Sequence, residues 1–358
     1  MIDIINAYSN YNNRAFIAGN VVIRNNKLSP SVKREKIISY NRSSALKRLF
    51  TWSWGFLQIL WLVKTRYRKA DLFIVSNPPL AGLIPLLCTN KFSLLIYDIY
   101  PDSLVAQKYI SANSFLARHW RNANRKIFQN AHKIFTISEG MKSVLKQYVD
   151  ANKIEVVSIW TDNSFLKPVE KPENIFIREH NLLDKFLIVY SGNLGHSHSV
   201  EVLLEVAREI TDPHIHFVII GEGDKKNLLI ERIQKYQLKN CLMLPLQPVE
   251  ILPFSLSAAD IAVVTLSKEA SGLSIPSKTF SLMSVGAPLL CIAAIDSELA
   301  VLINDHEIGK CFDPTEIGQM VNFINLVKSD KDYHSTLQLN ALKTSKSFGP
   351  ENAFKFVV

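Results

Sequence analysis

The feature that most constrains the fold is a repeated alternation of apolar runs, glycine-bearing turns and helical patterns between residues 186 and 292. The run FLIVYS at 186–191 precedes the turn GNLG and a helical pattern at 200–210, and HFVII at 216–220 precedes GEGDKK. The alternation continues through strand patterns at 241–244, 261–265 and 288–292 and helical patterns at 227–236, 251–259 and 277–285. Short continuous apolar runs between helices are typical of parallel strands covered on both faces, so this region predicts a doubly wound α/β domain.

The first half of the chain has the same alternation. Apolar runs at 72–76, 93–97, 133–137 and 154–159 are predicted as buried strands, helical patterns cover 114–131 and 140–148, and residues 1–7 have a short strand-like pattern. A chain of 358 residues exceeds what one hydrophobic core usually holds, so two domains are expected.

The domain boundary is placed by composition. The segment 160–179 contains KPVEKPEN, whose prolines and mixed charges are typical of a linker. We therefore predict a first Rossmann-like domain at 1–165 and a second at 166–340. The closing segment 341–358 is expected to cross back to the first domain.

Charge and cysteine content narrow the class of protein. Residues 1–170 hold 24 Lys and Arg against 10 Asp and Glu, whereas 171–358 hold 17 against 22, so the basic character belongs to the first domain. The four cysteines form no C-x-x-C pair, which favours reduced thiols in a cytoplasmic protein and argues against a zinc site. No cleavable signal peptide is expected, and the apolar run at 52–63 is too short to span a bilayer.

Three loops of the second domain follow strands and carry residues suited to a phosphate ligand. Gly192 and Gly195 let the backbone approach a ligand just before a helix begins, and GEG at 221–223 would lie along the same sheet edge. In SGLSIPSK at 271–278, Ser277 is predicted to cap a helix, and Lys278 in its first turn would clamp a phosphate. An ordinary structural turn and a surface lysine are the alternatives.

The order of SGNLG, GEG, PSK and GAP (286–288) resembles the C-terminal donor domain of GT-B glycosyltransferases of family 4. The segment IWTDNSFLKP at 159–168 resembles the family's domain junction, and DIYPDS at 98–103 resembles a bacterial subgroup that builds cell-surface polysaccharides, including colanic-acid and amino-sugar transferases. The resemblance implies two Rossmann-like domains facing each other across a cleft and a retaining transfer of a hexose or N-acetylhexosamine. It also implies a nucleotide diphosphate-sugar donor, for which we favour UDP, with no cofactor and no required metal.

The resemblance also implies roles for individual residues. Glu269 is a candidate catalytic carboxylate, because Ser271 and Ser281 stand where many members have glutamates. Because of those two serines, the alternative stays open that the protein is a relative that binds a nucleotide sugar with weak or lost catalysis. The implied donor-binding residues are Gly192, Asn193, Gly195 and His198 at the diphosphate, Gly221, Glu222 and Gly223 at the nucleoside, Leu246 and Gln247 at the base, and Ser271, Gly272, Leu273, Ser277 and Lys278 at sugar and phosphate.

In the first domain, Asp98 and Asp102 follow a predicted strand and are the candidate catalytic carboxylates that orient an acceptor hydroxyl or accept its proton. The alternative for Asp102 is a helix cap. The polar loop around Asn13 and Arg14 is predicted to contact acceptor or donor phosphate, with a solvated arginine as the alternative.

The tryptophan-rich segment from Lys47 to Lys69 has basic residues at both ends of an apolar centre. Such a helix suits the headgroup region of a membrane, and a helix buried on the sheet is the alternative. We favour membrane contact, which predicts a peripheral protein on the inner face of the cytoplasmic membrane and a polyprenyl-diphosphate-linked glycan as acceptor. A nucleic-acid partner is not expected, because no reading motif accompanies the basic charge.

Overall fold

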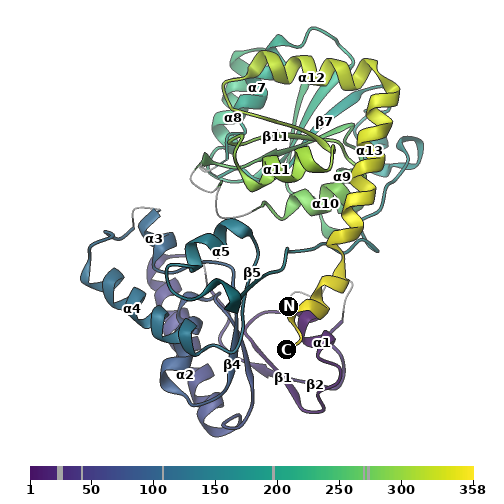
Figure 1. Ribbon diagram of the computed structural model, residues 1–358. Helices are drawn as coiled ribbons and strands as arrows, with labels where there is room; N and C mark the ends of the chain where they lie inside the picture. The colour runs from purple at the N-terminus through teal and green to yellow at the C-terminus, as the bar shows by residue number, and fades with distance from the viewer. Residues whose placement is uncertain (22–26, 42, 107–108, 196–197, 269–270, 272–274) are drawn as a thin grey trace. The chain divides into compact units, whose positions relative to one another are not determined.

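The computed structural model (Figure 1) describes residues 1–358 except 22–26, 42, 107–108, 196–197, 269–270 and 272–274. The chain forms two compact units, one of residues Met1–Ser158 with Glu351–Val358 and one of Ile159–Pro350. The first unit therefore ends seven residues before the predicted boundary, and only the last eight residues, not all of 341–358, join it.

The first unit is built on a parallel sheet with the strand order β3-β4-β5-β6 and on a separate parallel pair of β1 and β2, within the described ranges. Its core lies between β4 and β5 and the helices, where Leu94, Leu95 and Ile134 are almost fully buried. The elements of this unit are α1 (Ile2–Ala7), β1 (Arg14–Ala18), β2 (Val32–Lys36), α2 (Ala45–Thr65), β3 (Leu72–Val75), η1 (Pro79–Leu87), β4 (Phe92–Ile96), α3 (Asp102–Ala106), α4 (Phe115–Asn130), β5 (Ile134–Thr136), α5 (Glu139–Leu145), η2 (Ala151–Lys153), β6 (Ile154–Val156) and most of η7 (Pro350–Phe356).

The strand prediction for residues 1–7 is wrong, because this segment is the helix α1. Its two buried residues, Ile4 and Ala7, are three positions apart, which is helical rather than strand spacing. The C-terminal segment packs beside it: the Phe356 ring lies 4.9 Å from that of Phe135 in the sheet, and the Tyr8 hydroxyl donates to the Phe356 carbonyl.

The second unit contains a parallel sheet with the order β12-β11-β10-β7-β8-β9 in the part of the chain that is described. Its elements are η3 (Lys171–Glu173), α6 (Ile175–Glu179), β7 (Phe186–Asn193), α7 (Val202–Glu209), β8 (Ile215–Glu222), α8 (Lys226–Lys235), β9 (Cys241–Leu244), η4 (Val249–Ile251), α9 (Leu252–Ser257), β10 (Ile261–Thr265), α10 (Lys278–Ser284), β11 (Leu289–Ile292), α11 (Glu298–Asp305), β12 (Gly309–Phe312), α12 (Ile317–Ser329), α13 (Lys331–Ser345) and η6 (Lys346–Phe348).

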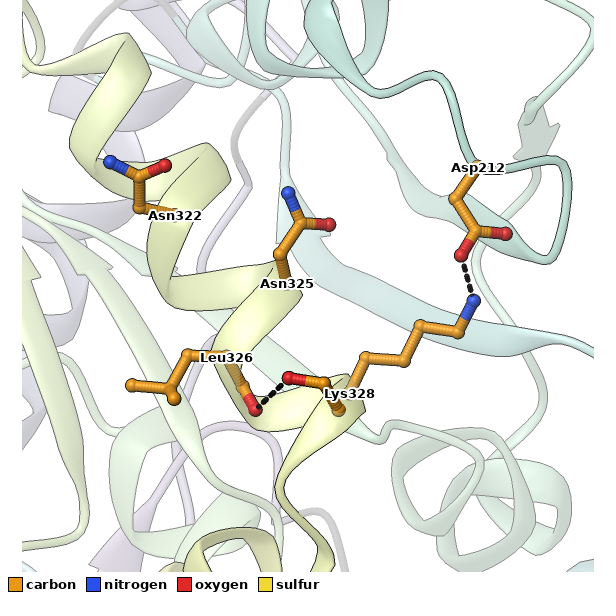
Figure 2. Close-up of a pocket in the computed structure, with 6 residues that line it drawn as sticks. Asp212, Asn322, Asn325, Leu326 and Lys328 are labelled. Carbon is orange, nitrogen blue, oxygen red and sulfur yellow. Dashed lines mark hydrogen bonds and ion pairs between the residues drawn. The ribbon is translucent and has the colours of Figure 1, made fainter.

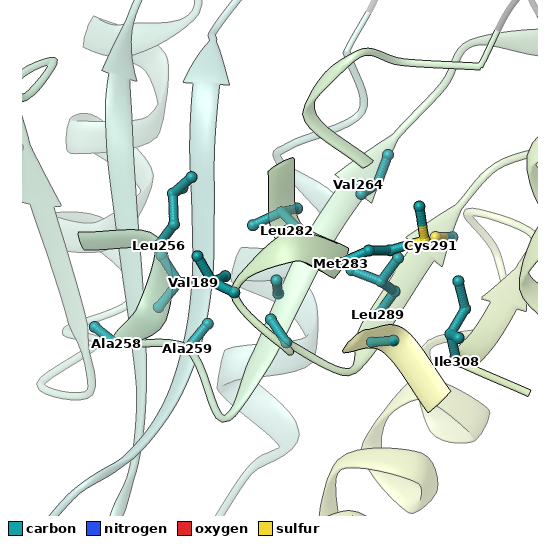
Figure 3. Close-up of a cluster of buried hydrophobic side chains, with 14 of the residues drawn as sticks. Val189, Leu256, Ala258, Ala259, Val264, Leu282, Met283, Leu289, Cys291 and Ile308 are labelled. Atoms are coloured by element: carbon teal, nitrogen blue, oxygen red, sulfur yellow. The ribbon is translucent and has the colours of Figure 1, made fainter. Parts of the chain in front are cut away.

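Both faces of this sheet are covered, which explains why its strands read as continuous apolar runs. Along β7, Leu187 and Val189 face a core formed with α9, α10 and α11, while Ile188 and Tyr190 face one formed with α7 and α12. Figure 3 shows the first of these cores around Met283. The predicted doubly wound α/β fold is confirmed.

The segment 160–179, predicted as a linker, is an integral part of the second unit. Phe176 and Ile177 of α6 are fully buried in its core, and the Asn174 amide donates to the Phe254 carbonyl at 2.8 Å. Among the described residues, no helix is both long enough and apolar enough to cross a bilayer.

Candidate functional site

The two glycine loops of the second unit meet at one edge of its sheet. β7 and β8 are parallel, and their register pairs Gly192 with Gly221 and Asn193 with Glu222. Beyond the strands, the Leu194 amide donates to the Glu222 carbonyl and the Lys225 amide donates to the Leu194 carbonyl, both at 2.9 Å. The loops are thus joined at the carboxyl edge, where open α/β sheets bind ligands.

Two of the glycines are required by this close approach of the loops. A Cβ built on Gly221 would lie 2.2 Å from the Gly192 carbonyl oxygen, and one on Gly223, whose φ is +150°, would lie 2.6 Å from the Leu194 carbonyl carbon. Gly221 and Gly223 therefore have a packing role whether or not they contact a ligand.

Gly192, unlike Gly221 and Gly223, lies next to the side chain of Lys278. A Cβ built on Gly192 would lie 3.7 Å from the Lys278 amine, so the first loop and the first turn of α10 share one site. The Lys278 Nζ atom is buried and makes no hydrogen bond within the described residues. It lies 3.8 Å from the centroid of the Tyr190 ring, and burial lowers the pKa of this amine from 10.5 to about 7.

A buried amine without an acceptor costs free energy, and a bound anion would remove that cost. Tyr190, which was not among the predicted site residues, ties the amine to the loop because its hydroxyl donates to the Asn193 carbonyl at 2.7 Å. The sequence signal for it is a single tyrosine in the largely apolar run FLIVYS.

His198 lies on the same side of the sheet. Its Nδ1 atom is 3.1 Å from the Thr265 hydroxyl at the end of β10, and burial together with the charge of Lys278 lowers the pKa of the imidazole. The neutral imidazole is thereby favoured, so His198 offers a hydrogen bond rather than a charge. Lys225 donates to the His198 carbonyl at 2.7 Å and to the Glu201 carboxylate at 2.8 Å, which fixes the loop before α7.

The other predicted donor-site residues lie around this centre with partners of their own. Glu222 forms an ion pair with Lys226 at 2.7 Å, and the Gln247 amide donates to the Pro245 carbonyl beside Leu246, whose side chain is 55% exposed. Glu269, Gly272 and Leu273 lie outside the described residues.

The serines of the third loop are engaged in local hydrogen bonds. The buried Ser271 donates to the Ser267 carbonyl, and the Ser281 hydroxyl is 3.1 Å from that of Thr161. The prediction that Ser277 caps α10 is wrong, because its side chain makes no capping bond and its backbone is already helical, with φ −58° and ψ −28°.

The two aspartates of the first unit do not act as a pair. Asp102 accepts a hydrogen bond from Arg121 Nε at 3.0 Å and another from the Tyr148 hydroxyl, so it joins α3 to α4 and to the end of α5. Asp98 accepts no side-chain hydrogen bond from the described residues, and burial raises the pKa of its carboxyl. Asp98 is therefore the more available of the two.

Arg14 is occupied by the fold. Its guanidinium donates to the Ile5 and Asn6 carbonyls at the end of α1 and to the Ser31 hydroxyl, so it completes that helix rather than extending into solvent. The neighbouring Asn13 is exposed.

The tryptophan-rich segment forms α2, which is neither fully buried nor fully exposed. Leu62 and Val63 are buried against the unit, while an outward stripe of apolar side chains recurs every three or four residues. The stripe, which we call the outer stripe of α2, consists of Leu46, Phe50, Trp54, Leu57 and Trp61, each between 49% and 81% exposed.

A surface pocket of the second unit lies away from these loops (Figure 2). It is lined by residues of α12 and by Asp212, which forms an ion pair with Lys328. Asp212 precedes β8, so this pocket lies at the amino edge of the sheet, opposite to the glycine loops. It has no part in the site described above.

The two parallel α/β units have the GT-B fold of glycosyltransferases. The crystal structure of HepE from Anabaena in complex with UDP and glucose superposes with a TM-score of 0.72 at 15% identity, over 99% of this chain and 92% of HepE. Residues 172–344 match the family described as glycosyl transferases group 1.

Two curated relatives share more sequence. A protein named as a probable glycosyltransferase, WbjE of Pseudomonas aeruginosa, is 27% identical over 318 residues, which are 83% of this chain and 77% of WbjE. WcaI of Escherichia coli K12, named as a colanic acid biosynthesis glycosyl transferase, is 28% identical over 203 residues, which are 55% of this chain and 49% of WcaI. The matched region thus covers about half of WcaI.

Proposed function

We propose that this glycosyltransferase moves a hexose or N-acetylhexosamine from a UDP-linked donor to a lipid-linked glycan during polysaccharide synthesis, with retention of configuration. The observation that carries the donor side is the buried Lys278 amine, which has no acceptor within the described residues and lies beside Gly192. A diphosphate placed there would accept from the amine and from backbone amides of the first loop. HepE, with the same fold, binds UDP and glucose.

The acceptor side of the proposal rests on the first unit. The outer stripe of α2 presents apolar side chains to solvent, with Lys47 and Arg48 at one end and Lys64 near the other. Tryptophans and basic residues of this arrangement suit the headgroup region of an anionic bilayer. A lipid-linked glycan would be presented at that surface, and Asp98 is the carboxylate available to a hydroxyl of the glycan.

A second candidate is a relative that binds the nucleotide sugar with little or no turnover. It is favoured by Ser271 and Ser281, whose hydroxyls make local hydrogen bonds and supply no carboxylate. Binding without transfer would be its signature.

The test is incubation of the purified chain with UDP-glucose, UDP-galactose and their N-acetylamino forms, each with and without a membrane extract that contains lipid-linked glycans. Release of UDP that depends on the extract, with a mass increase of one sugar in the lipid fraction, is the expected result. The anomeric configuration of the product is then read by NMR. Donor binding without UDP release would favour the second candidate, and neither binding nor release would overturn both.

A further inference from the structure

Four aromatic side chains of the first unit form two stacked pairs outside its hydrophobic core. The rings of Tyr40 and Trp52 are 5.7 Å apart at an interplanar angle of 21°, and those of Tyr100 and Trp120 are 6.0 Å apart at 23°. None of the four belongs to the buried cluster around β4 and β5. We call these four residues the aromatic platform.

The Tyr100–Trp120 pair has a carboxylate close to it in the chain, since Asp98 lies two residues before Tyr100. Burial raises the pKa of Tyr100 to about 12, and the charge of Asp98 and the phenol of Tyr40 act in the same direction. Asp98 and Tyr100 follow β4, at the carboxyl edge of the first sheet.

The platform is held in place by hydrogen bonds to the backbone at or next to its residues. The segment with Tyr40 is fastened to α2, because the Ile38 amide donates to Gln58 at 2.8 Å and the Asn41 amide donates to Thr51 at 3.4 Å. The buried Asn124 of α4 donates to the carbonyl of Tyr100. A set of aromatic rings that is fixed but open to solvent loses little entropy when it binds.

Exposure shows that the rings are accessible. Tyr40 is 40% exposed, and Trp52, Tyr100 and Trp120 are each partly exposed. Partly exposed aromatic rings with a carboxylate nearby match a ligand that has an apolar face and a polar rim. A sugar ring is such a ligand, because its C–H bonds pack on the negative face of an aromatic ring while its hydroxyls donate to a carboxylate.

We propose that the aromatic platform is a subsite for a sugar ring of the acceptor, which stacks on Tyr100 or Trp120 and donates a hydroxyl to Asp98. This inference rests on the proposed function, since it supplies the glycan part of that acceptor. Trp52 of the platform lies about one helical turn from Arg48 along α2, where a lipid diphosphate would find cations.

The test uses saturation-transfer difference NMR with n-octyl β-D-glucoside, the galactoside and the N-acetylglucosaminide, each below its micelle concentration, and n-octanol as the probe without a ring. The wild type is expected to saturate ring protons of at least one glycoside more strongly than its octyl chain. Trp120→Ala is expected to weaken that binding about fivefold or more, and Trp120→Phe to restore most of it. Tyr236→Ala, at a partly exposed aromatic residue of the second unit, is the matched control and is expected to bind as the wild type.

Saturation of the octyl chain alone, octanol binding as well as the glycosides, or unchanged affinity in Trp120→Ala would overturn the subsite. Tyr40→Ala is the second variant if Trp120→Ala does not fold, and it is expected to weaken binding in the same direction. UDP binding is measured on every sample. Glycoside binding without UDP binding would contradict the proposed function and leave the subsite supported. Normal UDP binding without glycoside binding would contradict the subsite alone.

Discussion

Replacing Lys278 by methionine is expected to stabilise the second unit while removing its anion site. Methionine has nearly the same length and packs on the Tyr190 ring, but it has no charge to bury. The unfolded chain holds this lysine at its ordinary pKa of 10.5, and the folded unit lowers that pKa to about 7. Folding therefore has to release a proton or bury a charge.

The size of the effect depends on pH with a defined sign. Because the folded-state pKa lies below the unfolded value, the unfolded chain binds more protons between pH 7 and pH 10.5, and raising the pH through that window stabilises the fold. From these two pKa values the cost of Lys278 is about 4 kcal/mol at pH 7 and about 1 kcal/mol at pH 9.5. The stability advantage of Lys278→Met is therefore expected to narrow by about 3 kcal/mol across that interval.

The assay is hydrogen exchange in β7 and β10 as a function of urea at both pH values, because these strands report the second unit alone. The exposed Lys239→Met is the control, and its free energy of unfolding is expected to differ little from that of the wild type at either pH. An advantage of Lys278→Met that does not change with pH, or a destabilised Lys278→Met at pH 7, would refute the burial of this amine.

Three further changes test other parts of the structure. Gly221→Ala should lower the free energy of unfolding by about 2 kcal/mol or more, because its Cβ would collide with a neighbouring carbonyl. The control Gly318→Ala, with open space around it in α12, should not destabilise the protein. Equal effects of the two substitutions in urea unfolding would contradict the close approach of the two loops. Trp54→Ser with Trp61→Ser should reduce co-sedimentation with phosphatidylglycerol vesicles, and unchanged sedimentation would remove the outer stripe of α2 as a membrane contact. Asp102→Asn should cost about 1–3 kcal/mol in thermal unfolding through its lost ion pair, and a neutral effect would leave Asp102 free for chemistry.

The sheets of both units could be predicted from the sequence because their strands are buried on both faces. Runs such as FLIVYS and the run at 261–265 are apolar except near their carboxyl ends, and the structure places β7 and β10 there. The strands that were missed lack this signal: β1 begins with Arg14, β2 is the charged VKREK, and β12 is GKCF, which contains an exposed lysine. The helix α1 was mistaken for a strand because six residues hold too few turns to show a period.

The site was predictable in outline and not in its contacts. Glycine loops after strands predicted that the two loops would meet at one sheet edge, because parallel strands bring their carboxyl ends together. The stacking of Lys278 on Tyr190 joins residues far apart in the sequence, and no local pattern specifies it. Arg14 and Asp102 illustrate the reverse, since both looked available in the sequence and both are bound by neighbours that only the fold brings near.

The most direct measurement is a calorimetric titration of UDP into the wild type and into Lys278→Met at pH 7. If the amine beside Gly192 holds the diphosphate, the variant should bind UDP about tenfold more weakly or worse while remaining folded, as expected for the loss of a charged hydrogen bond. Equal dissociation constants for the two proteins would contradict the placement of the donor at Lys278.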